Sequence, residues 1–385
     1  MNMASRIILI IAALLLTMSG YAFGSDIAIG MSLSLTGRYA EMGNMQQKGL
    51  FLWEKHVNEK GGILGRNVKI IIMDDKSSKE RAKNIYKRLI EKDKVDFVIG
   101  PYSSGISEAI LPVTEKNRYP VLLSGASADR LWEKGYRYAF GIYTPASKYT
   151  SGFLQMLVKQ KIENIAIISA EDTFSVSLSK GTRKWAQRFK LNVACFQVFK
   201  KGQKHLADIA LRAKESGSQA VIVCGHLNES VDMRLALKKI GWYPEAYYAS
   251  VGPATRQFYN ILKDDSNLTF SSSQWEESVG IRFPQGEEFI KAFHKYYKIS
   301  PSYHAATAYA AGMILEAALE KSGSLDKEDL RETLFSLDTM TVIGRYGVDK
   351  KGKQKRHFPL IIQWQNKKKN VVWPDSLKEL DPVFQ

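Results

Sequence analysis

The sequence predicts an α/β protein made of two parallel sheets, each covered by helices, and three observations support this prediction. Short β-branched runs alternate along the chain with stretches whose apolar residues recur at helical spacing. This alternation is typical of parallel sheets flanked by helices. It runs in two series that divide near residues 143–149. The length of 385 residues is enough for two domains, each with its own hydrophobic core.

The first series of elements occupies residues 26–123. We expect strands over 26–34, 68–73, 95–99 and 120–123, and helices over 44–59, 79–92 and 107–116. The stretch 79–92 illustrates the helical pattern, because Ala82, Ile85 and Leu89 fall on one face. A Gly-Pro pair at residues 100–101 ends the third strand.

The second series follows from residue 165 onward. We expect strands over 165–169, 193–199, 220–223 and 246–250, and helices over 177–190, 206–216 and 230–240. Two further helices are expected over 285–297 and 303–321. Basic runs at 350–356 and 367–369 are interpreted as solvated turns, with nucleic-acid contacts as the disfavoured alternative.

The first 24 residues have the features of a signal peptide. Arg6 supplies a positive charge, residues 7–16 form an unbroken apolar run, and small residues precede Ser25. We expect cleavage before Ser25 and a periplasmic location, without the cysteine that a lipoprotein anchor requires. An uncleaved N-terminal anchor is the alternative, although a run of ten residues is short for crossing a bilayer.

The net charge and the number of cysteines limit the classes of protein to which this chain can belong. The chain has 55 Lys and Arg against 39 Asp and Glu, a formal net charge of +16, and loss of Arg6 with the signal peptide leaves +15. A basic balance is compatible with nucleic acid, an anionic membrane surface or an anionic ligand. Two cysteines, Cys195 and Cys224, are too few for a disulfide scaffold or a cysteine-bound metal cluster. Whether they pair is left open.

No pattern typical of an enzyme is found. The sequence has no P-loop, no G-x-G-x-x-G after the first strand, no H-E-x-x-H and no G-x-S-x-G. Six scattered histidines give little support for a metal site. Asp74 and Asp75 follow a strand and could bind a cation, but strand-end carboxylates more often cap the chain. We therefore expect a protein that is not an enzyme and that uses no cofactor or metal.

Two strand-to-loop junctions are rich in small hydroxyl residues. One includes Tyr102, Ser103 and Ser104, and the other is residues 124–128. Ligands of parallel α/β sheets bind at the carboxyl ends of strands, where a following helix presents free N–H groups and the positive end of its dipole. Serine N-capping alone is the alternative. The occurrence of both junctions on consecutive strands favours a site for a carboxylate.

The ordered set of motifs resembles the periplasmic solute-binding proteins of the leucine/isoleucine/valine-binding family, over essentially all of the chain after the signal peptide. The markers are Leu35-Thr36-Gly37, residues 58–65, Asp74-Asp75, Ser103-Ser104, residues 124–127 and residues 136–140. The resemblance implies a type I binding-protein fold, with two doubly wound parallel-sheet lobes joined by three crossover strands. It implies a first lobe at 26–145 plus 276–358, and a second lobe at 146–275 plus 359–385.

The resemblance also assigns ligand-binding positions in the first lobe. Ser104 falls where the family has a carboxylate-binding serine. Ser127 falls where the family usually has Thr or Ser that contacts both carboxylate and amine, and the backbone of Gly125 and Ala126 belongs to the same contact. Tyr102 lies in the same junction as Ser104 and is included in the expected site.

Three further aromatic positions complete the expected site. Phe174 stands where the family commonly has a tyrosine that covers the ligand, and His226 matches another position that is frequently aromatic. A surface histidine at a strand end is the alternative for His226. Trp275 is expected either to line the cleft or to lie in the core.

One departure from the family bears on the ligand. The amino-acid binders of the family place an acidic residue just after the strand at 246–250, where it pairs with the α-ammonium, but here residues 250–254 contain no carboxylate. This absence favours an organic acid or amide without a free amine over leucine or valine, and Phe174 offers apolar cover that suits a ring or an alkyl chain. Glu276 or Glu277 replacing the missing carboxylate is the alternative.

The resemblance implies a receptor that captures a small ligand, an amino acid or a related carboxylate or amide, between two closing lobes. It further implies delivery to the permease of an ABC transporter in the inner membrane, and we expect the protein to be a monomer without nucleic-acid partners. A sensor subunit of the same fold that feeds a membrane signalling receptor is the alternative function.

Overall fold

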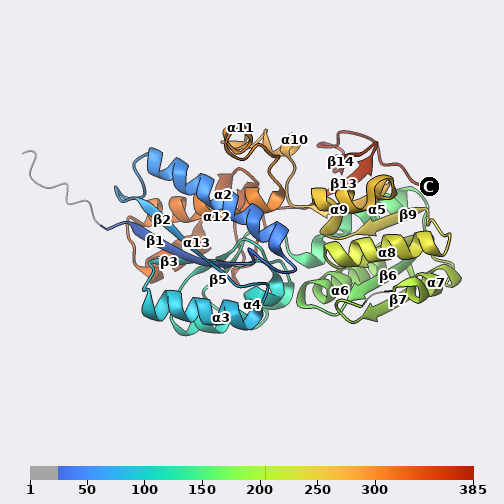
Figure 1. Cartoon of the computed structure of the whole chain (residues 1–385), viewed down its shortest axis with the longest axis horizontal. Helices are drawn as coiled ribbons and strands as arrows, with labels where there is room; N and C mark the ends of the chain where they lie inside the picture. Colours follow the sequence, from blue (N-terminus) through green and yellow to red (C-terminus); the bar gives the residue numbers. More distant parts are fainter. Residues whose placement is uncertain (1–24, 204) are drawn as a thin grey trace, which may run out of the picture.

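The structure is a computed structural model that describes residues 25–203 and 205–385. The predicted signal peptide and its cleavage site therefore lie at or outside the edge of the described residues. Two sheets lie side by side along the longest axis of the molecule, each between layers of helices (Figure 1). Among the described residues, no helix combines the length and apolar character needed to cross a membrane.

The first sheet has five parallel strands in the order β2-β1-β3-β4-β5. The strands are β1 (Ile27–Leu33), β2 (Val68–Asp74), β3 (Phe97–Gly100), β4 (Val121–Leu123) and β5 (Ala139–Gly141). Helix α2 (Ala40–Glu59) packs with α12 (Tyr303–Ser322) on one face, and α3 (Lys79–Lys87) packs with α4 (Ser104–Lys116) on the other. Three more helices and one hairpin belong to this half: α10 (Glu277–Gly280), α11 (Gly286–Tyr297), α13 (Lys327–Ser336), and the hairpin of β11 (Thr339–Thr341) with β12 (Gly344–Tyr346).

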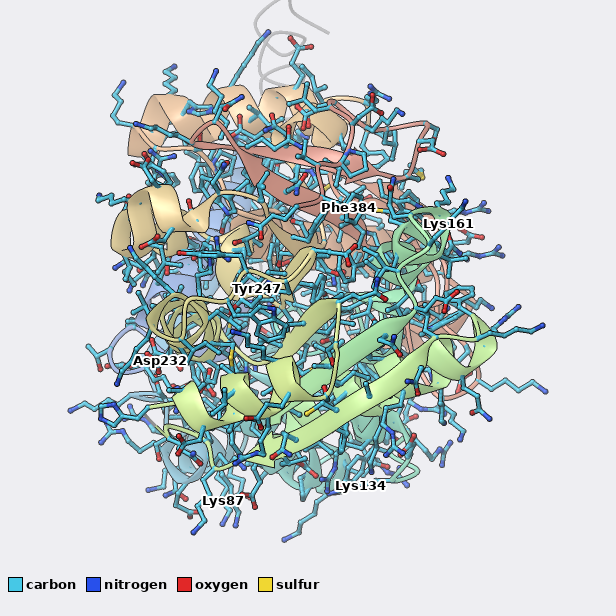
Figure 2. The ribbon with its side chains drawn as sticks, turned by 90° about the vertical axis from the view of Figure 1, so that its right-hand side faces the viewer. Lys87, Lys134, Lys161, Asp232, Tyr247 and Phe384 are labelled. Atoms are coloured by element: carbon cyan, nitrogen blue, oxygen red, sulfur yellow. The ribbon has the colours of Figure 1, made fainter. Side chains whose placement is uncertain are left out.

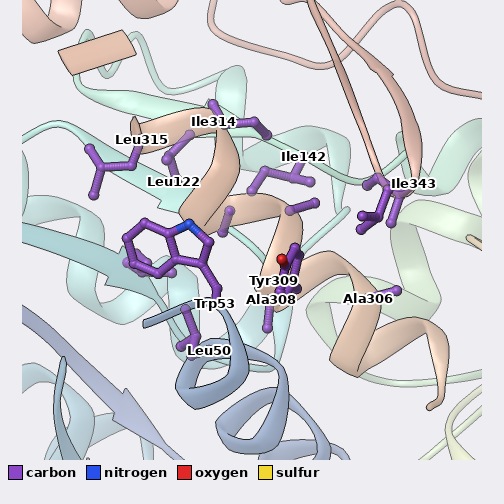
Figure 3. Packing of buried hydrophobic residues seen from close by; sticks show 14 of the residues in the cluster. Leu50, Trp53, Leu122, Ile142, Ala306, Ala308, Tyr309, Ile314, Leu315 and Ile343 are labelled. Atoms are coloured by element: carbon purple, nitrogen blue, oxygen red, sulfur yellow. The ribbon is translucent and has the colours of Figure 1, made fainter. Parts of the chain in front are cut away.

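Close packing of α2 against α12 joins segments that are far apart in the sequence. A Cβ at Gly49 would lie 2.1 Å from the Ala305 carbonyl oxygen, and a Cβ at Gly312 would lie 2.0 Å from the Trp53 ring. The Trp53 indole N–H donates to Glu316 at 3.0 Å, and the ring lies among Leu50, Leu315 and their neighbours (Figure 3). The core of the first half is therefore completed by residues near 310.

The second sheet has seven strands in the order β14-β13-β10-β9-β8-β6-β7. Five are parallel: β6 (Asn164–Ala170), β7 (Asn192–Phe199), β8 (Ala220–Cys224), β9 (Ala246–Ala249) and β10 (Thr269–Ser273). The last two, β13 (Leu360–Gln365) and β14 (Lys368–Trp373), run antiparallel to their neighbours. Helices α5 (Ser151–Lys159) and α6 (Thr173–Arg188) cover one face, α7 (Ala207–Glu215) and α8 (Leu227–Lys239) cover the other, and α9 (Arg256–Leu262) lies beside α8.

The chain passes between the two sheets three times, after β5, after β10 and after β12. We propose to divide the chain accordingly, with lobe one at 26–145 plus 276–358 and lobe two at 146–275 plus 359–385. These ranges are used below.

The helices that point toward the lobe junction begin earlier than their apolar pattern predicts. Helix α4 begins at Ser104 rather than 107, α6 at Thr173 rather than 177, and α8 at Leu227 rather than 230. Their first turns are polar because they cap the helix: Asp172, for example, accepts the N–H groups of Phe174 and Ser175 at 3.0 and 3.1 Å. A pattern based on apolar spacing misses such turns.

Three other expectations are corrected by the structure. The helix predicted over 79–92 ends at Lys87 and continues as a single π turn over Arg88–Lys92. Strands β13 and β14 were not expected, and the run 367–369 is not wholly a solvated turn. Lys369, at the start of β14, is mostly buried and pairs with Glu276 at 2.9 Å. The preferred interpretation of Asp75 agrees with the structure, because its carboxylate accepts from the hydroxyls of Ser32 and Ser34 at 3.0 and 2.6 Å, as a structural cap does.

The two cysteines are both free and buried. Cys195 lies in the cluster under α7 and α8, whereas Cys224 lies in the cluster under α5 and α6. They therefore belong to opposite faces of the second sheet.

Candidate ligand-binding site

A small cavity of about 10 Å³ lies between the two lobes. Lobe one contributes the carboxyl ends of β3 and β4 and the start of α12, and lobe two contributes the N-termini of α6 and α8. The lining residues are Tyr102, Ser103, Ser104, Gly125, Ser127, Tyr143, Tyr149, Phe174, His226, Val251 and Tyr303.

Six of the eight expected site residues meet in this cavity: Tyr102, Ser104, Gly125, Ser127, Phe174 and His226. Ala126 is adjacent in the chain, but its side chain is buried in the hydrophobic core of lobe one. Gly125 permits a close approach, since a Cβ there would lie 2.9 Å from the Cα of Tyr102.

Trp275 lies in the core of lobe one, and not in the cavity. Its ring packs edge-on against Phe289 with 5.8 Å between centroids, and its indole N–H donates to the Val342 carbonyl at 2.9 Å. The side chain is buried with its polar atom satisfied. We therefore remove Trp275 from the candidate site and assign it to the core, which was the alternative considered above.

The hydroxyls of Ser104 and Ser127 are arranged to donate into the cavity. Ser104 Oγ accepts the backbone N–H groups of Ser127 and Ala128, both at 3.1 Å. Ser127 Oγ accepts the Tyr149 hydroxyl at 3.0 Å. Ser104 Oγ already accepts two hydrogen bonds, so its own proton is the group left for a ligand. Ser127 Oγ accepts one, so it keeps its proton and one lone pair.

Four buried tyrosines surround these serines, and three of them were missed by the sequence analysis. Tyr143, Tyr149 and Tyr303 line the cavity together with Tyr102. Burial raises the pKa of all four phenols, so they stay protonated at neutral pH. Tyr143 and Tyr149 could have been found from the sequence, because they lie at the predicted lobe division at 143–149, where a site between the lobes was expected.

His226 is the one imidazole that lines the cavity, and it lies at the N-terminus of α8. Its Nδ1 lies 3.1 Å from the Tyr102 hydroxyl, a contact between the lobes. Its Nε2 lies 3.6 Å from Asp172. Burial alone would raise the pKa of Asp172, but His226 and Lys201 beside it hold that pKa well below its usual range.

The described residues that line the cavity include no Asp, Glu, Lys or Arg. The two candidate replacements for the family's acidic residue are engaged elsewhere. Glu276 pairs with Lys369 at 2.9 Å, and Glu277 pairs with His294 at 3.2 Å. The cavity is therefore lined by neutral hydrogen-bonding groups, aromatic rings and one imidazole.

Val251 holds the lobe-two side of the cavity in a strained turn. Its φ and ψ are 58° and −58°, and the Gly252 N–H donates to the Ser250 carbonyl at 2.6 Å, which closes a γ-turn. A β-branched residue at positive φ is rare and costs on the order of 1–3 kcal/mol. Such strain is concentrated at functional sites in folded proteins, and here it occurs at the segment where the family's acidic residue was expected.

Direct contacts close the junction around the cavity. Arg38 of lobe one forms an ion pair with Glu229 of lobe two. Thr173 donates to Glu108 at 2.9 Å, and Ser177 donates to Asp129 at 3.1 Å. The arrangement is that of two lobes in contact around an internal site.

Comparisons with known proteins agree with this architecture. A family model described as periplasmic binding protein matches residues 26–369. The chain belongs to the periplasmic binding protein family. Within that family, a Leu/Ile/Val-binding protein homologue of Brucella suis is 25% identical to this chain over 378 residues, covering 91% of this chain and 92% of that one.

Solved periplasmic binding proteins share the fold. A leucine-binding protein from Thermotoga maritima superimposes with a TM-score of 0.82 at 20% identity, covering 91% of this chain and 100% of that one. A branched-chain amino acid binding protein from Streptococcus pneumoniae, in complex with isoleucine, gives 0.81 at 22% identity, covering 91% and 100%. A solute-binding protein from R. palustris in complex with benzoate gives 0.78 at 16% identity, covering 90% and 95%.

Proposed function

We propose that this periplasmic binding protein captures a small organic acid or amide without a free amine and delivers it to the permease of an ABC transporter. The observation that carries the proposal is the lining of the cavity, where hydroxyl protons converge and no described lining residue is a carboxylate. An ammonium buried there without a counter-charge would cost several kcal/mol. A carboxylate or carbonyl group would instead accept from the hydroxyls of Ser104 and Ser127.

The apolar part of the cavity suits a ring or an alkyl group. Phe174 and the four tyrosines provide aromatic surface, and Phe174 packs edge-on against Tyr149 with 5.6 Å between centroids. Aromatic pairs prefer such edge-to-face arrangements. The benzoate complex of the structural relative from R. palustris supports an aromatic carboxylate as the first candidate, since that ligand has no amine.

The test is a ligand screen on ligand-free protein. The chain is unfolded in denaturant, dialysed and refolded, which needs no oxidant because both cysteines are free. Benzoate, other aromatic carboxylates, amides, dicarboxylates and the branched-chain amino acids are then compared by thermal shift and titration calorimetry. We expect an aromatic or aliphatic acid to bind with a Kd at or below micromolar and leucine to bind at least a hundredfold more weakly. Micromolar binding of leucine, isoleucine or valine would contradict the proposed ligand class.

The role in transport is tested separately from the ligand. Export with cleavage before Ser25 is checked by N-terminal sequencing of protein from the producing cell. Delivery is supported if the ligand-loaded protein stimulates ATP hydrolysis and ligand uptake in membrane vesicles that contain the ABC transporter encoded by neighbouring genes. Genes for a membrane signalling receptor in place of a permease would favour the sensor subunit instead, with the same cavity and the same ligand.

A further inference from the structure

A groove of about 740 Å³ crosses the lobe junction outside the ligand cavity. Its lobe-one wall is formed by the turn at residues 129–134 and by Lys353, and its lobe-two wall is formed by residues 147–148 and one face of α6. Seven Lys or Arg side chains line it against two carboxylates: Arg130, Lys134, Lys148, Lys180, Lys184, Arg188 and Lys353 against Asp129 and Glu133. The groove is therefore strongly cationic.

Helix α6 presents an unbroken row of positive charge to the groove. Lys180, Lys184 and Arg188 are four residues apart, so they lie on one face of the helix. Like charges at this spacing destabilise a helix slightly. Among the described residues, Lys180 and Lys184 form no ion pair, and Arg188 lies over the Trp185 ring, 5.2 Å from its centroid. No carboxylate on α6 compensates the row.

Two carboxylates in or beside the groove, Asp129 and Glu108, already have partners. Asp129 accepts the Ser147 N–H at 3.0 Å and the Ser177 hydroxyl at 3.1 Å, and lies 3.5 Å from Lys353. Glu108, just outside the groove, pairs with Arg130 and Lys134 at 2.9 and 2.7 Å.

On the lobe-one wall, Arg130, Lys134 and Lys353 are paired with Glu108 and Asp129, whereas the row on α6 has no such counter-charge. Lys134, which belongs to the lobe-one wall, lies at the lower edge of the molecule in Figure 2. The row on α6 belongs to lobe two and moves with it. An anion that contacts the α6 row and the lobe-one cations together would hold the two walls near one another and favour the closed arrangement.

We propose that this groove binds an anion with two or more phosphate groups, and that the anion bridges the two lobes and stabilises the closed form. Ammonium and guanidinium groups are the usual partners of phosphate oxygens, and the Trp185 indole provides a flat surface beside them. A pyrophosphate and the phosphorylated headgroups of a membrane surface share this chemistry. The proposal does not depend on which solute the internal cavity takes.

The experiment uses inorganic pyrophosphate as the probe and the whole refolded protein. Titration calorimetry at low salt should give a Kd in the micromolar range that weakens about tenfold or more in added NaCl, since exposed charges are screened. The Lys180→Gln/Lys184→Gln double variant should bind at least tenfold more weakly. The Lys83→Gln/Lys87→Gln variant is the matched control, because these lysines on α3 have the same spacing and the same charge but lie outside the groove. Equal losses in both double variants would overturn the site.

Two further arms test bridging and the source of the phosphate. Lys134→Gln changes only the lobe-one wall, so unchanged pyrophosphate affinity in this variant would overturn bridging. Co-sedimentation with phosphatidylglycerol vesicles, against phosphatidylcholine vesicles, distinguishes a membrane surface from a free anion. Binding of the anionic vesicles that is lost in the α6 variant supports a headgroup, whereas binding of neither pyrophosphate nor vesicles overturns the proposal.

Discussion

Arg38 of lobe one and Glu229 of lobe two form an ion pair across the lobe junction, and the Glu229 side chain is only 3% exposed there. The second carboxylate oxygen of Glu229 accepts the backbone N–H of His226 at 3.0 Å, so the same carboxylate caps the N-terminus of α8. This one residue therefore connects the contact between the lobes to the helix that carries a cavity-lining imidazole.

Replacing Arg38 by Ala should weaken ligand binding at least tenfold, because closure would then bury Glu229 without its partner. Removal of one member of a buried charge pair costs about 2–5 kcal/mol at protein interfaces. Titration calorimetry with the best ligand of the screen measures the effect. Arg345→Ala is the control, since Arg345 pairs with Asp338 on the exposed surface and such pairs contribute about 0–1 kcal/mol. Equal affinities of wild type and Arg38→Ala would show that closure does not use the pair.

Replacing Ser127 by Ala should weaken binding about tenfold or more, because a hydrogen bond to a charged group contributes roughly 1.5–3 kcal/mol. It should also lower stability slightly, since the Tyr149 hydroxyl loses this acceptor. Ser127→Thr keeps the hydroxyl and should retain most of the affinity. Ser104→Ala should also lower stability, since the N–H groups of Ser127 and Ala128 lose their acceptor. Calorimetry for affinity and thermal unfolding for stability separate the two effects. An unchanged Kd in both alanine variants would remove these serines from the site.

Replacing Lys369 by Met should lower the free energy of unfolding by about 3–5 kcal/mol, because Glu276 would be left buried without its partner. Burial raises the pKa of Glu276, and Lys369 at 2.9 Å opposes that rise. The double variant Lys369→Met/Glu276→Gln should recover most of the loss. Lys367→Met is the control, since Lys367 is exposed. Urea denaturation measures all four proteins, and a double variant as unstable as the single one would contradict this account.

Stability should fall as the pH is lowered from about 6.5 to 4, because two buried histidines resist protonation. Burial lowers the pKa of His357 to about 4 and that of His304 to about 3, from an ordinary value of 6.5. The unfolded chain therefore binds more protons in this window, and each histidine costs about 1.4 kcal/mol of stability per pH unit.

His357→Gln should make the dependence of unfolding free energy on pH less steep by about 1.4 kcal/mol per pH unit, which is the contribution of one histidine. The control is His205→Gln, which changes an exposed side chain. Denaturation curves at several pH values between about 4 and 7 provide the measurement. Identical slopes for wild type and His357→Gln would show that the His357 imidazole does not titrate differently in the two states.

The alternation of strands and helices, and the junctions that carry Ser104 and Ser127, were predictable because they are local patterns. A serine after each of two consecutive parallel strands must come to the same sheet edge. Tyr303 could not be found in this way, since it reaches the cavity from α12, far along the chain. The pairing of Lys369 with Glu276 was missed for the same reason, and a run of three lysines gave no sign that one is mostly buried.

Trp275 shows the opposite error. A large aromatic residue near a crossover fits either a cleft or a core, and only the acceptor of its indole N–H decides. The strain at Val251 was equally invisible, because nothing in a Ser-Val-Gly-Pro sequence requires positive φ at the valine.

The threefold passage of the chain between the sheets has a consequence for the order of folding. The core of lobe one needs α12, and the sheet of lobe two needs β13 and β14. The chain end also packs on lobe two, where Phe384 contacts Phe270 and the Gln385 N–H donates to the Glu245 carbonyl at 2.9 Å (Figure 2). A chain synthesised from its N-terminus can therefore complete lobe one only after the segment 276–358 and lobe two only after β14 and Phe384, and contacts of such long sequence separation form slowly. Late completion of both lobes would favour the export proposed above, because it leaves the chain time to cross a membrane before it folds.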